Sequence, residues 1–352
     1  EATRGRNDDR TVIVATGDLF ASAQQWSRAG FFYRQAFQQS QVSAIYQRYL
    51  DALMNATPAN LPEAEAVLAR LNDRVDREPG LLMARAWILQ RRGRAEDAAR
   101  DIQAALRRID AGNVAEVQSW AGQFRRILPE PQPAIDTLTL LKRGVENPDW
   151  LDYLIAVTSA ERPEGAETAI SILRRLASAS SLAPVREVSL RSLGLTLYGL
   201  NRFEEAAAVM ADGVRRSPQD WELNNNLAFV LARHLNRPQE ALAYAQRAAE
   251  LAPSRAETLD TLGVVQMENG LLREAEQSLR RALEASESVV TRFAVLVHLA
   301  DATLRTNTPE ARAQALRHLD AAKALMDAAP PNAIPRPSVE DYEELRGKIG
   351  SP

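Results

Sequence analysis

The side chains best suited to chemistry in this sequence are three histidines and a series of doubled arginines, because there is no cysteine. His298 and His318 are 20 residues apart and fall on the two helices of one expected pair, so they could approach each other in space. A zinc site needs three or four protein ligands, and no acidic third ligand accompanies them. We therefore expect His234, His298 and His318 to have packing or surface roles, and we expect no metal site and no cofactor.

Sequence motifs for catalysis are missing as well. The chain contains no glycine-rich phosphate loop, no His-Glu-x-x-His segment, no acidic calcium loop and no Gly-x-Ser-x-Gly turn. No set of convergent catalytic groups can be assembled from the other residues. The prediction is that the chain is not an enzyme and has no catalytic residues.

Doubled arginines recur along the chain and could form a basic stripe for phosphate or for an acidic partner. Cations near the last turn of a helix also interact favourably with its dipole while they stay solvated. Acidic residues lie close to each pair in sequence or on neighbouring helices. We favour this second interpretation for the four pairs, which are Arg107-Arg108, Arg174-Arg175, Arg215-Arg216 and Arg280-Arg281.

The composition is that of a folded protein and argues against several classes of function. The chain has 352 residues, 43 Lys and Arg against 46 Asp and Glu, and 45% hydrophobic residues. This near-neutral balance argues against bulk binding of nucleic acid, which needs a clear basic excess. No apolar run approaches the length that crosses a membrane, and without cysteine no disulfide can form.

The origin and the compartment follow only loosely from the residues. Arginine outnumbers lysine 40 to 3, which we interpret as the codon bias of a GC-rich bacterial genome. The first ten residues are charged and polar and include neither an initiator Met nor an apolar signal core. We therefore expect a processed product or a piece of a longer protein. The localisation stays unknown, with a slight preference for the cell envelope or periplasm over the cytoplasm because cysteine is absent.

A fixed period of 34 to 35 residues is the most informative pattern: Leu193-Gly194, Leu227-Ala228 and Leu262-Gly263 recur at that distance. Small residues at these and two later positions let antiparallel helices approach closely, and prolines end the first two units. The later positions and the prolines are Ala206, Gly213 and Pro218, then Ala241, Ala248 and Pro253, then Ala275 and Ala282. The pattern predicts stacked helical hairpins over 187–287, with a capping box from Ser254 and Glu257 in the third.

This spacing resembles the tetratricopeptide repeat (TPR) family, most clearly over residues 187–287 and more weakly over 10–110 and 290–327. The resemblance implies an all-α fold, a right-handed α-solenoid of about nine TPR-like helix pairs with a C-terminal capping helix. The expected parts of one continuous solenoid are a polar lead (1–9), TPR-like units 1–3 (10–110), degenerate pairs (111–186, as 113–145 and 148–180), units 6–9 (187–327) and the capping helix (338–349).

The capping helix is expected to cover the exposed end of the last repeat, as terminal caps must. Its Val339, Tyr342, Leu345 and Ile349 form one apolar stripe at helical spacing.

In tetratricopeptide arrays the first helices line a concave face where peptides or partner helices bind. Counting from the Gly or Ala of each unit, we expect a partner-binding groove lined by Trp87, Arg191, Leu195, Tyr198, Asn225, Asn226, Phe229, Arg233, Asp260, Val264 and Met267. Trp87, Tyr198, Phe229 and Met267 would form a discontinuous apolar strip, and an exposed strip usually marks a binding site. The alternative is that tight winding or the chain's own terminal helix already buries these side chains.

The expected function is a non-enzymatic protein–protein interaction scaffold or adaptor that binds a peptide segment or helix in this groove. Two alternatives stay open: the TPR recognition arm of a larger enzyme, and a structural component of a bacterial envelope or secretion assembly. The partner is expected to be a protein or peptide, with no nucleic acid and no membrane span, and self-association stays open. A site for a chaperone's C-terminal carboxylate is rejected, because Leu195, Glu257 and Thr261 provide no positive charge for it.

Overall fold

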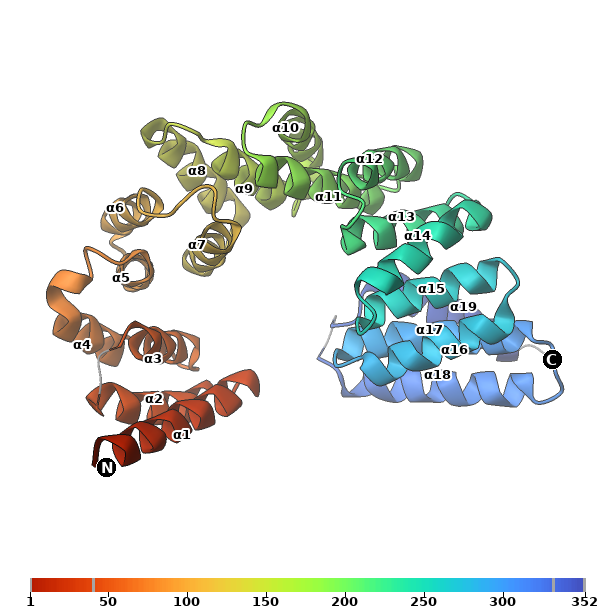
Figure 1. Ribbon diagram of the computed structural model, residues 1–352, viewed down its shortest axis with the longest axis horizontal. Coiled ribbons are helices and arrows are strands. Elements are labelled where there is room, and N and C mark those ends of the chain that lie inside the picture. Colours follow the sequence, from red (N-terminus) through yellow and green to blue (C-terminus); the bar gives the residue numbers. More distant parts are fainter. Residues whose placement is uncertain (1, 40–41, 331–332, 351–352) are drawn as a thin grey trace. The chain divides into compact units, whose positions relative to one another are not determined.

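The computed structural model describes residues 2–39, 42–330 and 333–350 (Figure 1). Within these residues there are nineteen α-helices and no strand, which confirms the expected all-α fold. The chain forms two compact units, unit 1 (1–165) and unit 2 (166–352). In the described part of the chain, no helix combines the length and apolar character needed to span a membrane.

The helices of unit 1 include the polar lead expected over 1–9, because the first helix begins at Ala2 and not near residue 10. They are α1 (Ala2–Ser22), α2 (Trp26–Gln39), α3 (Ser43–Asn55), α4 (Leu61–Leu71), α5 (Pro79–Arg91), α6 (Ala95–Leu106), α7 (Val114–Ile127), α8 (Pro131–Leu141) and α9 (Asp149–Ser159), with short 3-10 turns at Asn72–Arg74, Lys142–Gly144 and Pro163–Gly165. Gly17 shows why a small residue is needed between α1 and α2: a Cβ there would lie 2.5 Å from the ring of Tyr33. The weaker repeat in this unit therefore uses the same close helix contact.

The pair expected at 113–145 is helical but does not form a hairpin. Helix α7 packs mainly against α5, whereas α8 packs mainly against α9. The buried side of α7 carries Trp120 and Phe124, whose rings stack 5.2 Å apart, instead of small residues. Bulky rings at the contact positions keep a second helix from approaching as it does in the regular repeats.

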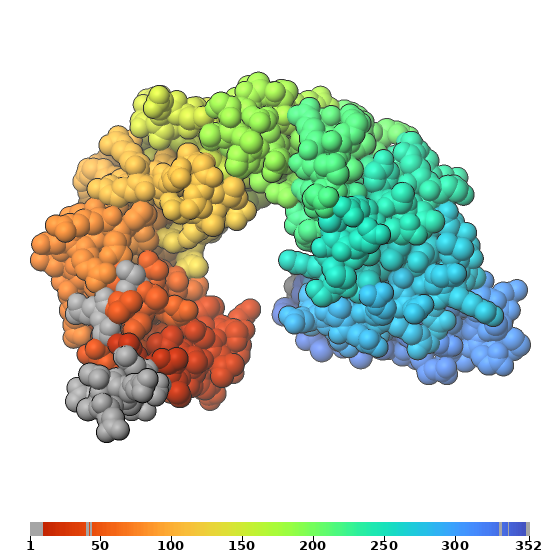
Figure 2. All heavy atoms as spheres, viewed as in Figure 1, coloured from red at the N-terminus to blue at the C-terminus, as the bar shows by residue number. Residues whose placement is uncertain are grey.

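Unit 2 contains four consecutive helical hairpins. Its helices are α10 (Ala166–Ala179), α11 (Ala183–Gly199), α12 (Phe203–Arg216), α13 (Trp221–Arg233), α14 (Pro238–Leu251), α15 (Ala256–Glu268), α16 (Leu272–Ala285), α17 (Val289–Arg305), α18 (Ala311–Ala328) and α19 (Arg336–Gly350). Each of α11, α13, α15 and α17 packs against the helix that follows it. In the space-filling view these four hairpins, coloured green to blue, form a continuously packed surface (Figure 2).

Small residues permit these hairpins, as the spacing predicts. Ala206, Ala241 and Ala275 are completely buried between the helices. A Cβ on Gly194 would lie 2.8 Å from Met210, and one on Gly263 would lie 2.5 Å from Leu279. Real Cβ atoms do not approach this closely, so the glycines are required by the packing.

Helix α19 covers the end of the last hairpin, which confirms the expected capping helix. Tyr342, Leu345 and Ile349 are buried in one hydrophobic cluster with residues of α17 and α18. The ring of Tyr342 lies 5.9 Å from that of Phe293, measured between centroids. Without α19 this apolar surface would face water.

One expected helix start is wrong. Helix α15 begins at Ala256 with Arg255 at the N-cap and no side-chain cap, so Ser254 lies one residue too early for the predicted capping box. Helix α13 does have a side-chain cap, because Asp220 accepts a hydrogen bond from the backbone N–H of Leu223 at 3.1 Å. Asp220 thus fixes the start of the helix that carries Phe229 and Arg233.

Candidate functional site

The first helices of the hairpins in unit 2, α11, α13, α15 and α17, present the residues that the repeat register singles out. We call the side that carries these residues the first-helix face. Four of the eleven expected groove residues are buried: Trp87 (1% exposed), Asn225 (8%), Val264 (0%) and Met267 (2%). The expectation that they line an open surface is therefore wrong.

Packing within the protein encloses these four side chains. Met267 lies in a hydrophobic cluster with Leu279 of α16 and Leu299 of α17, and α15 itself packs against both α13 and α17. In unit 1, Trp87 is covered in part by its own helix, because the guanidinium of Arg91, one turn further along α5, stands 3.8 Å from its ring. Their burial thus removes these positions from any groove.

The other seven residues remain accessible to different degrees. Leu195 is 51% exposed. Six are partly exposed: Arg191, Tyr198, Asn226, Phe229, Arg233 and Asp260. Leu195 and Tyr198 are three residues apart on α11, so they lie side by side on one face of the helix.

An aromatic cluster of Tyr198, Phe203, Phe229 and His234 joins α11, α12 and α13. The Tyr198 ring lies 5.7 Å from Phe203, 6.4 Å from Phe229 and 5.3 Å from His234. His234 stacks on Phe203 at 4.0 Å, nearly parallel. Burial, followed by the charge of Arg233, lowers the pKa of His234, so at neutral pH the ring packs as an uncharged aromatic.

Sequence reasoning missed Phe203 and His234, because it counted only positions within the first helices. Phe203 is the first residue of α12, and His234 directly follows α13. The sequence did offer a way to find them, because both residues have aromatic rings and each lies at a helix end close to a predicted first helix. Tyr198 and Phe229 alone would make a smaller surface than the four rings together.

The polar residues of the first-helix face on α11 and α13 are largely held by the protein itself. Arg191 pairs with Asp220 at 2.9 Å and with Glu222 at 3.4 Å. The Asn225 amide N–H donates to Asn226 Oδ1 at 3.4 Å, while the Asn225 side-chain oxygen is buried without a hydrogen-bond partner. Arg191 is therefore committed to neighbouring carboxylates, and the Asn225–Asn226 pair keeps unused hydrogen-bonding capacity.

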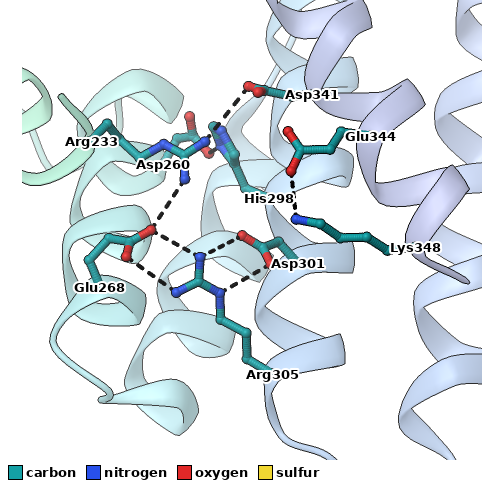
Figure 3. A network of polar contacts seen from close by, with 9 residues as sticks. All are labelled: Arg233, Asp260, Glu268, His298, Asp301, Arg305, Asp341, Glu344 and Lys348. Atoms are coloured by element: carbon teal, nitrogen blue, oxygen red, sulfur yellow. Dashed lines mark hydrogen bonds and ion pairs between the residues drawn. The ribbon is translucent and has the colours of Figure 1, made fainter.

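A charged network continues from α13 across α15 and α17 to α19 (Figure 3). Glu268 accepts from Arg233 at 3.2 Å and from Arg305 at 3.1 Å. Arg305 also pairs with Asp301 at 3.0 Å. The nine members of this charged network are Arg233, Asp260, Glu268, His298, Asp301, Arg305, Asp341, Glu344 and Lys348.

His298 is the most enclosed member of the charged network, with 11% of its side chain exposed. Its Nδ1 lies 2.8 Å from Asp260 Oδ1. Burial disfavours the protonated ring, but the charge and the hydrogen bond of Asp260 outweigh burial, so the pKa of His298 is raised. This ion pair ties α17 to α15 beside the first-helix face.

The histidines and doubled arginines that were candidates for chemistry have structural roles. His298 faces Asp260, whereas burial and then Arg280 lower the pKa of His318. Within the described residues, no group of three His, Asp or Glu side chains has an arrangement that could hold a metal ion. Among the doubled arginines, Arg174 pairs with Glu205, Arg215 and Arg216 pair with Asp212, and Arg280 pairs with Glu276.

Unit 1 has a cleft of its own between α3, α5 and α7, with a volume of about 500 Å³. Buried Leu50, Met83 and Trp120 form apolar parts of its lining, and Gln47 and Gln123 are among its polar residues. The sequence prediction placed Trp87 in the groove of this unit, but Trp87 does not line the cleft. Its mixed lining gives the cleft no clear charge preference.

The hairpins α11–α12, α13–α14 and α15–α16 carry the predicted small residues at their helix contacts, so the fold is TPR-like. No protein-family model matches the sequence, and no curated protein matches it.

Several solved structures are similar to parts of this chain. One is a tetratricopeptide repeat protein from Parabacteroides merdae ATCC 43184 (15% identity, 77% of this chain, 98% of that chain, TM-score 0.48). Others are a thermophilic TPR protein from Thermus thermophilus (18% identity, 57% and 96% coverage, TM-score 0.42) and MamA from Desulfovibrio magneticus RS-1 (18%, 51% and 96%, 0.42). Because the similarity is partial and the identity low, the functional argument rests on this chain's own residues.

Proposed function

We propose that this chain is a protein-interaction scaffold that binds a peptide segment or a helix of a partner on the first-helix face of unit 2. The observation that carries the proposal is the apolar surface of α11 and α13. Leu195 is 51% exposed, and the partly exposed rings of Tyr198 and Phe229 lie beside it. Exposed apolar side chains that adjoin one another in this way are typical of a surface that contacts another molecule.

A partner gains affinity by covering this surface. Burying apolar area stabilises a complex by about 25 cal/mol per Å² before the costs of association are subtracted. Aromatic rings that pack against one another lose little side-chain freedom when a partner arrives, so they make efficient anchors. Asn226, which is partly exposed, can add hydrogen bonds to the backbone of an extended segment.

The test is a pull-down from the source lysate with residues 1–352 as bait, compared with the double variant Leu195→Ser and Tyr198→Ser. Serine removes apolar surface without adding charge. We expect a partner retained by the wild type and lost by the double variant. Circular dichroism and thermal unfolding check that the variant stays folded.

Leu140→Ser is the matched control, because Leu140 is a similarly exposed apolar residue (56%) on α8 in unit 1. It should keep the partner. Retention of the same partner by the Leu195/Tyr198 double variant, or its loss in the Leu140 variant, would show that the assigned surface is wrong.

A further inference from the structure

The terminal helix brings negative charge to the proposed partner surface. Tyr342 and Leu345 fix α19 in the hydrophobic cluster with α17 and α18. The same helix directs Asp341 toward Arg233 of α13, and its Glu344 pairs with Lys348, as Figure 3 shows. A helix held so firmly presents these carboxylates in fixed positions beside α13.

The charged network has more acid than base. It contains five carboxylates against two arginines, one lysine and one histidine. Glu268 engages both arginines at 3.1 to 3.2 Å. The contact of Asp341 with Arg233 is longer, 3.9 Å, and the guanidinium is shared with Glu268. Because Asp341 has only this weak pairing among the described residues, its carboxylate can bind a further cation.

Asp341 also lies next to a helix of the aromatic cluster, because Arg233, its partner at 3.9 Å, is one turn after Phe229 on α13. Burial raises the pKa of Tyr198, and the negative charge of Asp341 raises it further. A cation paired with Asp341 would therefore lie next to the end of α13, the helix that contributes Phe229 to the aromatic cluster. Leu195, which adjoins Tyr198 on α11, offers an apolar contact next to that position.

We propose that the partner segment is cationic: a Lys or Arg side chain pairs with Asp341 beside Tyr198, and a neighbouring apolar side chain packs on Leu195. This inference rests on the proposed function and names the chemistry of its partner. A segment rich in Asp or Glu does not fit, because Asp220 and Glu222 already hold Arg191. Arg233 is likewise held by Glu268, so neither of these two arginines is left to receive an anion.

The experiment uses the full chain and three fluorescein-labelled peptides in fluorescence anisotropy. The peptides share one leucine–serine framework and carry lysine, glutamate or only serine at the variable positions. We expect the lysine peptide to bind more tightly than the other two, and added salt to weaken its binding. Asp341→Asn should weaken the lysine peptide by about fivefold, the loss expected for one exposed ion pair, and should leave the serine peptide unchanged.

Glu343→Gln is the matched control, since it removes the same charge from an exposed residue of α19 outside the charged network. Equal weakening by Glu343→Gln and Asp341→Asn would mean that only general negative charge is sensed, and would overturn the proposal. Tighter binding of the glutamate peptide would also overturn it.

The lysate experiment separates this inference from the proposed function. A partner lost on Leu195→Ser with Tyr198→Ser but unaffected by Asp341→Asn would leave the scaffold function standing and the cationic preference wrong. A lysine peptide that binds equally well to the Leu195/Tyr198 variant would place its site elsewhere and contradict both.

Discussion

At the scale of single residues, His298 links the protonation state of the protein to the stability of unit 2. Its side chain is nearly enclosed and pairs with Asp260 at 2.8 Å. The pKa of His298 is raised in the folded state above its ordinary value, because the Asp260 carboxylate outweighs the effect of burial. The unfolded chain therefore loses this proton at a lower pH than the folded chain does.

We predict that the stabilising effect of this ion pair is complete below a pH of about 6.5 and is lost as the pH rises through the higher folded-state pKa. His298→Gln should cost roughly 1.5–3 kcal/mol at pH 6, the range for a hydrogen bond to a charged group, and less at pH 8. The measurement is thermal unfolding of both proteins across this pH range. A cost that stays constant or grows with pH would contradict the assignment.

The exposure of individual groove residues could not be predicted from the sequence. Leu195 and Val264 occupy the same register, one residue after Gly194 and Gly263, yet Leu195 is 51% exposed and Val264 is completely buried. The difference comes from α15, which packs between α13 and α17. Because burial depends on the neighbouring helices and not on the register, counting along one helix cannot reveal it.

At the scale of helices, close contact within each hairpin depends on residues without bulk. Gly263 on α15 would place a Cβ 2.5 Å from Leu279 and 3.2 Å from the carbonyl oxygen of Ala275 on α16. The backbone carbonyl cannot move aside without disturbing α16. Alanine would favour the helix by roughly 1 kcal/mol through its propensity, but overpacking of this contact costs about 1–3 kcal/mol.

We predict that Gly263→Ala lowers the free energy of unfolding of unit 2 despite the gain in helix propensity. Gly199→Ala is the control, because Gly199 ends α11 and a Cβ there meets no atom within 4 Å. That variant should be neutral or slightly stabilising. Urea unfolding of both variants measures these changes in the free energy of unfolding. A stabilised Gly263 variant would show that the helix contact is looser than the distances indicate.

The elements themselves were largely predictable from the sequence, and the site was less so. The small residues of 187–287 and the apolar stripe of α19 are local patterns, and each corresponds to an observed hairpin or cap. The departure of α7 and α8 from a hairpin depends instead on bulky Trp120 and Phe124. Likewise, the pair of Asp260 and His298 joins residues from two hairpins, so only the packing of those hairpins brings it together.

At the scale of the molecule, unit 2 contains everything that the proposed binding surface needs. The aromatic cluster, the charged network and the two C-terminal hydrophobic clusters are all formed by residues after 166. In helical repeat proteins stability is approximately a sum over repeats and contacts between neighbours. A segment with its own core and its own terminal cap should therefore fold independently.

We predict that a fragment of residues 166–352 is helical, unfolds cooperatively and binds the lysine peptide within about threefold of the full chain, because a difference of that size is well under 1 kcal/mol. Circular dichroism and anisotropy measure both properties.

The fragment of residues 1–165 is the matched control, since it has the cleft between α3, α5 and α7 but lacks Asp341 and Tyr198. It should not distinguish the lysine peptide from the glutamate peptide. An unfolded 166–352 fragment would mean that unit 2 depends on contacts with the preceding helices, and a folded fragment that fails to bind would mean that its surface is incomplete.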